Sequence, residues 1–245
     1  MKILGIIPAR FNSSRFPGKP LAQINGHPMI EWVYRGALES SLLTDLYVAT
    51  DHQGIYQAVL DFGGKAILTS SLHETGTERC YEALNLIDQP FDALINIQGD
   101  EPLIQAAQID LLAKLISKPE VDLATLCTPI SNKAIINNPN NIKVVFDHQN
   151  RALLFSRSPI PFPREKKAAR YFEHIGMYAY KLGILEKIVH LKPGHLERSE
   201  KLEQLRWMEN GYSIYLSETK AGNISVDTPE DLQKVIKSIR TKRLL

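Results

Sequence analysis

Short apolar runs alternate with amphipathic stretches along the first half of the chain. Residues 3–7, 46–50, 66–68 and 93–97 are apolar and predict buried strands. Between and after them, residues 28–38, 53–62, 77–87 and 104–116 repeat their apolar positions with the period of a helix. Strands that alternate with helices are typical of parallel sheets. The first half therefore predicts a largely parallel, doubly wound α/β fold.

The second half has a different pattern. Two apolar runs, 143–146 and 152–155, flank a polar stretch and predict a β-hairpin, and residues 158–163 carry three prolines that favour extended backbone. Further apolar patterns predict strands at 175–180 and 213–217 and helices at 182–190, 201–210 and 229–240. The chain shows no low-complexity linker and no internal repeat. One domain, residues 1–245, with a β-rich elaboration is the simplest interpretation.

Composition and charge narrow the function classes. The 245 residues are 44% hydrophobic and 23% charged with a net charge of +2, which is typical of a soluble globular protein. The basic stretches 164–167 and 240–243 are not interleaved with aromatic residues, so we expect no nucleic-acid partner. We also expect no membrane partner, because no apolar run is long enough to form a signal peptide or a membrane span.

The chain has only two cysteines. Cys80 and Cys127 are far apart in sequence and suggest neither a disulfide framework nor a zinc site. A reducing compartment and a cytoplasmic location are therefore the expectation.

The loop after the first apolar run is the most informative stretch. Arg10, Arg15 and Lys19 lie within it, separated by small and hydroxyl residues. Ligands of open α/β sheets bind at the carboxyl ends of the strands, and arginine and lysine are the residues that bind phosphate. The loop therefore indicates a polyphosphate site, although a solvated basic turn would have the same charge. It is neither a P-loop nor a dinucleotide-binding G-x-G-x-x-G turn.

Two aspartates are candidates for metal binding. Asp100 follows the apolar run 93–97, and Asp227 precedes the last helix. Carboxylates of this kind, together with substrate phosphates, are typical Mg²⁺ ligands. The alternative for residues 99–102 is ordinary turn chemistry, and residues 228–231 have the pattern of a helix cap that does not require Asp227.

Other polar positions have weaker signals. Residues 74–79 open a helix whose backbone N–H groups could bind an anion or a base carbonyl, although Thr75 or Thr77 could simply cap it. In the second half, several side chains could together bind a polyhydroxylated acid, but each alone is typical of surface or core: Arg157, His174, Tyr178, Glu203 and Gln204. No Ser-His-Asp or Cys-His arrangement and no metal-binding histidine spacing is visible.

The ordered set of motifs resembles the 3-deoxy-manno-octulosonate cytidylyltransferase family, also called CMP-Kdo synthetases. The matching segments are residues 8–20, 49–51, 76–79, 96–102, 155–157, 174–178, 202–206 and 226–231, which extend over almost the whole chain. The resemblance implies a glycosyltransferase-A-like fold, with a mixed, mostly parallel central sheet flanked by helices and a smaller β-rich dimerisation arm. Residues 1–130 would be mainly nucleotide-binding, and residues 131–225 mainly sugar-binding and dimerising. The chain departs from the pattern in residues 162–172, which are short and very basic.

The resemblance also implies the reaction CTP + Kdo → CMP-Kdo + diphosphate, with Mg²⁺ as cofactor, in a homodimer that supplies lipopolysaccharide biosynthesis. By position, catalysis is implied for Arg10, Arg15 and Lys19, and nucleotide binding also for Ala9, Gly76, Thr77, Arg79 and Gln98. Metal binding is implied for Asp100 and Asp227, and sugar binding for Arg157, His174, Tyr178, Glu203 and Gln204. The sequence leaves open a related sugar acid, such as 8-amino-Kdo or a sialic acid. A non-catalytic nucleotide-binding regulator is disfavoured, because all five charged residues of the implied phosphate and metal site are present.

Overall fold

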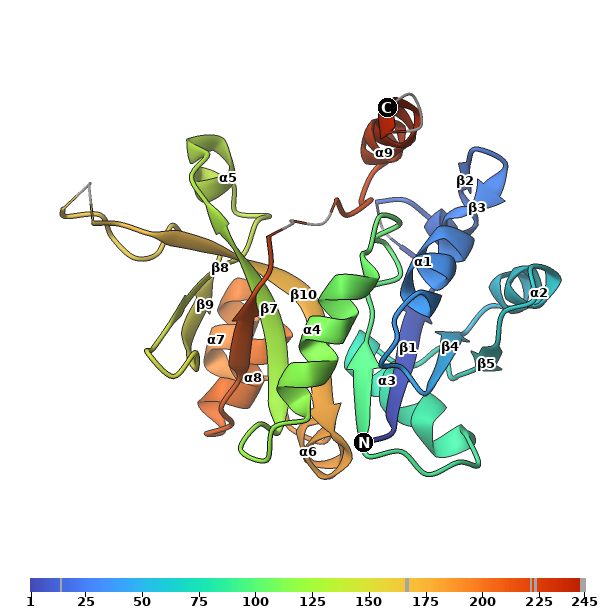
Figure 1. Ribbon diagram of the computed structural model, residues 1–245, viewed down its shortest axis with the longest axis horizontal. Coiled ribbons are helices and arrows are strands. Elements are labelled where there is room, and N and C mark those ends of the chain that lie inside the picture. Colours follow the sequence, from blue (N-terminus) through green and yellow to red (C-terminus); the bar gives the residue numbers. More distant parts are fainter. Residues whose placement is uncertain (14, 166–167, 221, 223, 243–245) are drawn as a thin grey trace. The chain divides into compact units, whose positions relative to one another are not determined.

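The computed structural model describes residues 1–13, 15–165, 168–220, 222 and 224–242, with side chains as far as residue 239. The chain divides into two compact units (Figure 1). The first contains Met1–Asp110 and the C-terminal segment that begins at Asn223, and the second is Leu111–Gly222. The prediction of a single domain stays a prediction, and each unit is described by itself.

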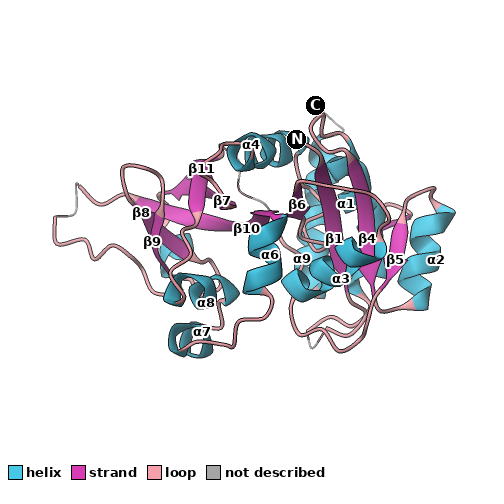
Figure 2. Cartoon of the chain, turned by 90° about the horizontal axis from the view of Figure 1, so that it is seen from below, coloured by secondary structure: helices cyan, strands magenta, loops and turns pink. Residues whose placement is uncertain are grey.

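The sheet of the first unit is parallel throughout. Its hydrogen-bonded order is β6 (Ala93–Asn96), β1 (Ile3–Ala9), β4 (Asp45–Thr50), β5 (Ala66–Leu68), as Figure 2 shows. These are the four strands that the apolar runs predict, and β1 and β6 are buried along almost their whole length, as expected for strands covered on both faces. Because the strands are parallel, their carboxyl ends share one edge, where Ala9 pairs with Thr50.

The predicted helices of this unit are confirmed to within about two residues. They are α1 (Met29–Leu38), α2 (Gln53–Asp61), α3 (Gly76–Leu86) and α4 (Ala106–Ile116), which contains the division between the units. The C-terminal α9 (Pro229–Lys242) packs buried Leu232 and Val235 into a cluster with Ile24 and Met29. Between β1 and α1 lie a short 3₁₀ helix, η1 (Lys19–Leu21), and a small hairpin of β2 (Gln23–Ile24) and β3 (His27–Pro28).

The second unit contains a mixed sheet. β7 (Leu123–Ile130) pairs antiparallel with β10 (Tyr171–Lys181) and parallel with β11 (Tyr215–Glu218). The predicted hairpin is confirmed as β8 (Lys143–Phe146) and β9 (Ala152–Ser156). Its helices are α5 (Lys133–Asn137), α6 (Leu182–Ile188), α7 (His195–Glu200) and α8 (Glu203–Glu209).

Several elements of the second unit differ from the sequence-based prediction. The predicted helix 201–210 starts at Glu203, because Lys201 adopts a left-handed backbone (φ 53°) that ends α7. Helix α7 itself has no buried residue and hence no apolar pattern to reveal it. Strand β7 was not predicted, and β10 begins four residues earlier than expected, because polar residues such as Glu173 occupy its first half. No helix in the described parts of the chain is long and apolar enough to cross a membrane.

Candidate active site

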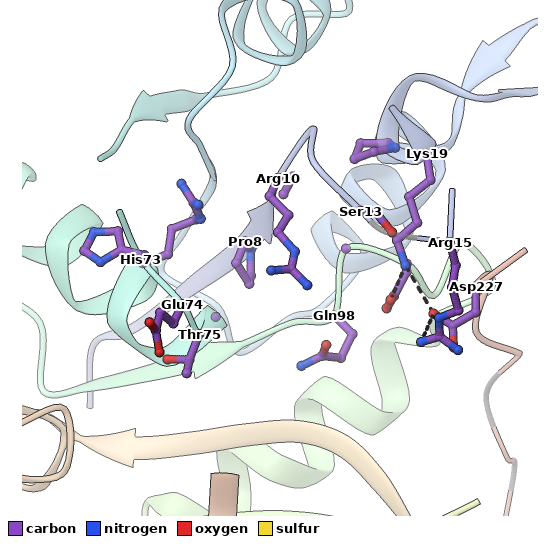
Figure 3. A pocket seen from close by; sticks show the side chains of 16 residues that line it. Pro8, Arg10, Ser13, Arg15, Lys19, His73, Glu74, Thr75, Gln98 and Asp227 are labelled. Atoms are coloured by element: carbon purple, nitrogen blue, oxygen red, sulfur yellow. Dashed lines mark hydrogen bonds and ion pairs between the residues drawn. The ribbon is translucent and has the colours of Figure 1, made fainter. Parts of the chain in front are cut away.

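A pocket of about 290 Å³ lies at the carboxyl edge of the parallel sheet in the first unit (Figure 3). Its walls come from the loop after β1, the loop after β6, the start of α3 and the segment before α9. Nine of the residues implied for nucleotide or metal binding line it: Ala9, Arg10, Arg15, Lys19, Gly76, Arg79, Gln98, Asp100 and Asp227. The remaining one, Thr77, is only 1% exposed and does not line the pocket.

The basic loop after β1 is folded back on itself rather than extended. The Gly18 amide donates to the Phe11 carbonyl at 2.8 Å, and Gly18 has a left-handed backbone with φ 70°. A Cβ at Gly18 would also come within 3.2 Å of the Phe11 ring, so glycine suits this turn in both conformation and space. The turn leads into η1, which fixes the backbone of Lys19 at the pocket wall.

The two candidate metal ligands converge on one lysine. The Lys19 ammonium donates to Asp100 Oδ2 at 2.7 Å and to the Val226 carbonyl at 3.0 Å, and it lies 3.5 Å from Asp227 Oδ1. Arg15 Nη2 is 3.2 Å from the same Asp227 oxygen. Figure 3 shows these ion pairs side by side. The basic loop and the two carboxylates therefore form one ion-paired cluster.

The backbone explains why the two carboxylates lie together. The Val226 amide donates to the Asp100 carbonyl at 2.8 Å, which ties the segment before α9 to the loop after β6. The loop also passes close to β1, because a Cβ at Gly99 would lie only 2.7 Å from the Pro8 carbonyl oxygen. Thr228 and Asp231 form the predicted capping box, with Asp231 N to Thr228 Oγ1 at 3.3 Å and Thr228 N to Asp231 Oδ2 at 3.2 Å. The cap does not use the Asp227 side chain, as predicted.

The donor set fits a divalent cation. Mg²⁺ takes one or two protein carboxylates, with phosphate and water oxygens completing its shell at about 2.1 Å. Asp100 and Asp227 both contact one ammonium group, so both reach a single position that already holds positive charge. No cluster of three or more potential metal-ligating side chains is found among the described residues.

The start of α3 is capped as the simpler interpretation predicts. Thr75 Oγ1 accepts from the Glu78 amide at 3.2 Å, and the Glu78 carboxylate accepts from the Thr75 amide in return. This capping box satisfies backbone donors that a ligand would otherwise have to bind.

Arg79 lines the pocket from within the protein core. It is 3% exposed, and its guanidinium donates to Thr69 Oγ1 at 2.6 Å and to the Ser70 carbonyl at 3.2 Å. A third contact, 3.2 Å to Asp51 Oδ2, makes a buried ion pair. Arg79 therefore holds the segment before α3 in place, whereas Arg10 is exposed and has no ion-pair partner among the residues that the structure describes.

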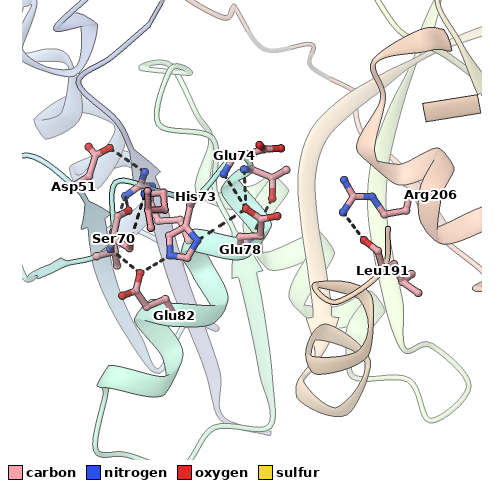
Figure 4. Close-up of polar contacts among 12 residues, drawn as sticks. Asp51, Ser70, His73, Glu74, Glu78, Glu82, Leu191 and Arg206 are labelled. Carbon is pink, nitrogen blue, oxygen red and sulfur yellow. Dashed lines mark hydrogen bonds and ion pairs between the residues drawn. The ribbon is translucent and has the colours of Figure 1, made fainter. Parts of the chain in front are cut away.

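His73 is a pocket residue that the sequence analysis missed. Its Nε2 contacts the Glu82 carboxylate, and its Nδ1 lies 4.0 Å from Glu78 (Figure 4). The Glu82 carboxylate also accepts from the Ser70 amide at 2.8 Å. Although partial burial opposes the shift, hydrogen bonds from His73 and Ser70 hold the pKa of Glu82 below its ordinary value. The only sequence signal was the position of His73 in the loop before α3.

In the second unit, two of the five implied sugar-binding residues lie in an aromatic cluster. The His174 ring is 5.3 Å from Tyr178 and 5.0 Å from Phe155, and Tyr178 is 5.1 Å from Trp207 of α8. Desolvation lowers the pKa of His174 to about 3, so it is neutral at ordinary pH. The Tyr178 hydroxyl is buried and has no hydrogen-bond partner among the described atoms, and burial raises its pKa.

The Thr125 hydroxyl contacts His174 and two backbone carbonyl groups. Thr125 Oγ1 lies 2.8 Å from the Met177 carbonyl oxygen, 3.1 Å from the Ile175 carbonyl oxygen and 2.9 Å from His174 Nε2. Both carbonyl oxygens can only accept, so a hydroxyl that donates to either of them leaves its oxygen to accept from His174 Nε2. This arrangement favours the tautomer with the proton on Nε2.

The other three implied sugar-binding residues have different surroundings. Arg157 donates to the carbonyls of Glu200 at 2.6 Å and Pro139 at 2.9 Å, and so it fixes the end of α7. Glu203 and Gln204 form the first turn of α8, with Gln204 buried. The structure thus brings His174 and Tyr178 together and gives Arg157 backbone partners.

The comparisons with known proteins agree with this architecture. The fold and the pocket define a nucleotidyltransferase-like α/β enzyme, and the family model described as "Cytidylyltransferase" matches residues 4–219. Two similar relatives, each named 3-deoxy-manno-octulosonate cytidylyltransferase, come from Cytophaga hutchinsonii (47% identity, covering 96% of both chains) and Fusobacterium nucleatum (47% identity, covering 100% of this chain and 99% of the relative). A solved structure of CMP:2-keto-3-deoxy-manno-octonic acid synthetase complexed with CTP is 43% identical, with a TM-score of 0.94 over 99% of this chain and 100% of that chain. The chain therefore belongs to the 3-deoxy-manno-octulosonate cytidylyltransferase family, and the resemblance of its motifs is confirmed.

Proposed function

We propose that this chain transfers CMP from CTP to 3-deoxy-D-manno-octulosonate (Kdo), giving CMP-Kdo and diphosphate. The names of the relatives and the CTP complex of the similar structure support this reaction. The observation in the structure that supports it most directly is the convergence of the basic loop and two carboxylates in one pocket. The product would supply an activated sugar for lipopolysaccharide biosynthesis.

The proposed transfer needs no reactant other than CTP and Kdo. The anomeric hydroxyl oxygen of Kdo attacks the α-phosphorus of CTP and forms a new O–P bond. The bond from the α-phosphorus to the bridging oxygen breaks, and diphosphate leaves with that oxygen. The hydroxyl proton is released to phosphate or solvent. Such reactions depend mainly on positioning and charge stabilisation.

The basic loop is suited to the charge that develops. Arg10 is exposed toward the pocket, with its guanidinium available for a bidentate contact with phosphate oxygens. Arg15 and Lys19 would exchange carboxylate partners for phosphate oxygens as the triphosphate binds. Donors of this kind at a leaving diphosphate lower the barrier because they stabilise charge that appears only in the transition state.

Asp100 and Asp227 are the residues that would hold Mg²⁺. The ion would neutralise phosphate charge and lower the pKa of the attacking hydroxyl. Within the protein, the loop that packs on Pro8 holds the backbone of Asp100, and the cap of α9 holds the backbone of Asp227. The backbone positions of both residues are therefore fixed before any ligand binds.

For the sugar acid, the second unit offers donors and acceptors of defined character. His174 is neutral because its pKa is lowered to about 3, and the Tyr178 hydroxyl has no hydrogen-bond partner among the described residues. A polyhydroxylated substrate presents both donors and acceptors, so these groups suit it. Arg157, Glu203 and Gln204 complete the proposed set, and homodimer assembly and a cytoplasmic location stay predictions.

The experiment that tests the proposal is diphosphate release with CTP and Mg²⁺. Kdo, 8-amino-Kdo and N-acetylneuraminate would be offered separately, with ATP, GTP and UTP as nucleotide controls. We expect release with CTP and Kdo. Release with only one of the other sugar acids would keep the reaction and change the substrate. No release from folded, metal-loaded protein with any pair would overturn the proposal.

A further inference from the structure

We propose that Lys19 holds the two carboxylates of the candidate metal site until a triphosphate draws its ammonium away, so that a divalent cation binds tightly only together with the nucleotide. This inference rests on the proposed function, because it assumes that the same pocket receives a nucleoside triphosphate and a metal ion. It adds an order of events and a second role for Lys19.

The ammonium of Lys19 is already surrounded by the oxygens that a metal would need. It donates to Asp100 Oδ2 at 2.7 Å and to the Val226 carbonyl at 3.0 Å, and Asp227 Oδ1 is 3.5 Å away. The Lys19 side chain is only 15% exposed, so water screens these interactions less than on the open surface. Lys19 is therefore the internal counter-cation of this carboxylate pair.

A metal ion and the ammonium cannot share these oxygens. A divalent ion bound about 2.1 Å from Asp100 would lie within a few ångströms of Nζ, where like charges repel strongly. Entry of the metal alone must break the two hydrogen bonds of Lys19 and leave its charge without a partner. The affinity of the nucleotide-free protein for a divalent cation is lowered accordingly.

Arg15 contributes less to this competition. It contacts only Asp227, and its side chain is 58% exposed, so the ion pair is screened by solvent. Lys19 contacts both carboxylates and the backbone of the segment before α9. The control of metal binding thus depends on one side chain.

A triphosphate offers Lys19 a different set of oxygens in the same pocket. The backbone of Lys19 is fixed by the Gly18 turn and by η1, whereas its four-carbon side chain can rotate. When the ammonium turns to the phosphates, Asp100 and Asp227 lose their counter-cation at the moment when phosphate oxygens become available to the metal. Nucleotide and metal then strengthen each other's binding by the same factor, as thermodynamic linkage requires.

The decisive measurement is Mn²⁺ binding to the nucleotide-free protein. Metal–phosphate contacts produce some coupling in any nucleotide enzyme, so coupling alone would not identify Lys19. Free Mn²⁺ would be followed by electron paramagnetic resonance in titrations of the wild type, Lys19→Met and Lys65→Met. Lys65 is the matched control, because it pairs with Asp45 at 2.7 Å in the same unit but does not line the pocket.

We expect Lys19→Met to bind Mn²⁺ about 5- to 150-fold more tightly than the wild type, the usual range of such couplings. Lys65→Met should match the wild type. With α,β-methylene-CTP present, the gain in Mn²⁺ affinity should be larger in the wild type than in Lys19→Met, because the variant has no ammonium to release.

Equal or weaker Mn²⁺ binding by folded Lys19→Met would overturn the inference. Thermal unfolding establishes that each variant is folded. Two further variants separate charge from size: Lys19→Gln removes the positive charge, and Lys19→Arg keeps it. The inference requires tight binding in Lys19→Gln and wild-type binding in Lys19→Arg, and the opposite order contradicts it.

The Mn²⁺ titration and the test for CMP transfer can fail independently of each other. If the wild type makes CMP-Kdo but Lys19→Met does not gain Mn²⁺ affinity, the reaction stands and the role of Lys19 falls. If Lys19→Met gains affinity while the wild type transfers CMP to no sugar acid, the competition at the carboxylates stands and the reaction falls.

Discussion

The two candidate binding regions of this protein differ in how they are organised before any ligand arrives. The pocket of the first unit is charged, and its Arg15 and Lys19 form ion pairs with Asp100 and Asp227. The cluster around His174 and Tyr178 in the second unit is aromatic and neutral, with Tyr178 buried and His174 half-buried. One region is prepared by ion pairs that a ligand must rearrange, and the other by packing. Substitution of the ion-paired residues of the basic loop should therefore affect catalysis, and substitution of packed residues should affect stability.

The largest effect is expected from Asp100→Asn. The substitution keeps the size of the side chain but removes a charge that the proposed metal site needs. We expect turnover to fall by about 10³-fold, or about 4 kcal/mol of transition-state stabilisation, while the fold is retained. Steady-state kinetics and thermal unfolding measure the two properties.

Asp45→Asn is the matched control. Asp45 also pairs with a lysine, at 2.7 Å, but lies at the start of β4, away from the pocket. Turnover should be unchanged in this variant. Near-normal turnover in folded Asp100→Asn would remove Asp100 from the metal site.

Arg79 and Arg10 line the same pocket, but we expect Arg79 to stabilise the fold and Arg10 to bind CTP. Arg79 is buried and paired with Asp51, so Arg79→Ala leaves the Asp51 carboxylate without its partner. This substitution should lower the free energy of unfolding by about 3 kcal/mol. Arg10→Ala removes an exposed side chain, and we expect little loss of stability but a 10- to 100-fold rise in KM for CTP, equivalent to roughly 1.5–3 kcal/mol of charged hydrogen bonding. Urea unfolding and steady-state kinetics of both variants test these two roles. An unstable Arg10→Ala with a normal KM for CTP would show that Arg10 stabilises the fold instead of binding CTP.

The fold was predictable where the apolar pattern is regular. Each strand of the parallel sheet and each long helix of the first unit appeared in the sequence, because burial of these elements produces a clear period. Helix α7 was not predictable, since its face is entirely polar or half-exposed. The start of β10 was missed for a related reason: Glu173 and His174 bond to neighbouring loops and strands rather than forming an apolar run.

The residue types of the candidate site could be predicted from the sequence, but most of their contacts and their burial could not. Arg10, Lys19 and Asp100 follow strands whose ends meet, so their proximity follows from the parallel sheet. The contact of Lys19 with the Asp227 side of the site could not be predicted, because it joins segments more than 200 residues apart. Nor could it separate buried Arg79 from exposed Arg10, since both are arginines beside glycine-rich or proline-rich turns. The roles implied by the resemblance for these residues stay predictions.

His174 in the second unit should make the free energy of unfolding depend on pH below neutrality. The pKa of His174 is about 3 in the folded protein, against an ordinary value of 6.5, so the unfolded chain binds a proton that the folded protein excludes. This contribution to stability is complete above about pH 6.5 and is lost as the pH falls toward 3, with a slope of at most about 1.4 kcal/mol per pH unit.

His174→Asn should therefore lose stability less steeply between pH 7 and pH 5 than the wild type, whatever its stability at pH 7. Urea unfolding at several pH values measures the slope. Identical slopes in the two proteins would mean that His174 takes up its proton without unfolding.

The smallest effect is expected from His73→Gln. His73 braces the segment before α3 through Glu82 and does not contact the proposed metal ligands. We expect a 3- to 10-fold rise in KM for CTP with kcat almost unchanged, since about 1 kcal/mol of positioning would be lost. A fall in kcat with unchanged KM would instead place His73 at the reacting atoms.

In the proposed reaction, CMP is transferred from CTP to a sugar acid in the charged pocket. The most direct test is ³¹P nuclear magnetic resonance of a mixture of protein, CTP, Kdo and Mg²⁺. We predict that the three CTP signals decay while one phosphodiester signal and diphosphate grow at the same rate, and that Asp100→Asn shows neither change on the same time scale. Persistence of the CTP signals with folded wild-type protein, or release of diphosphate with CMP and no phosphodiester, would contradict the proposed transfer.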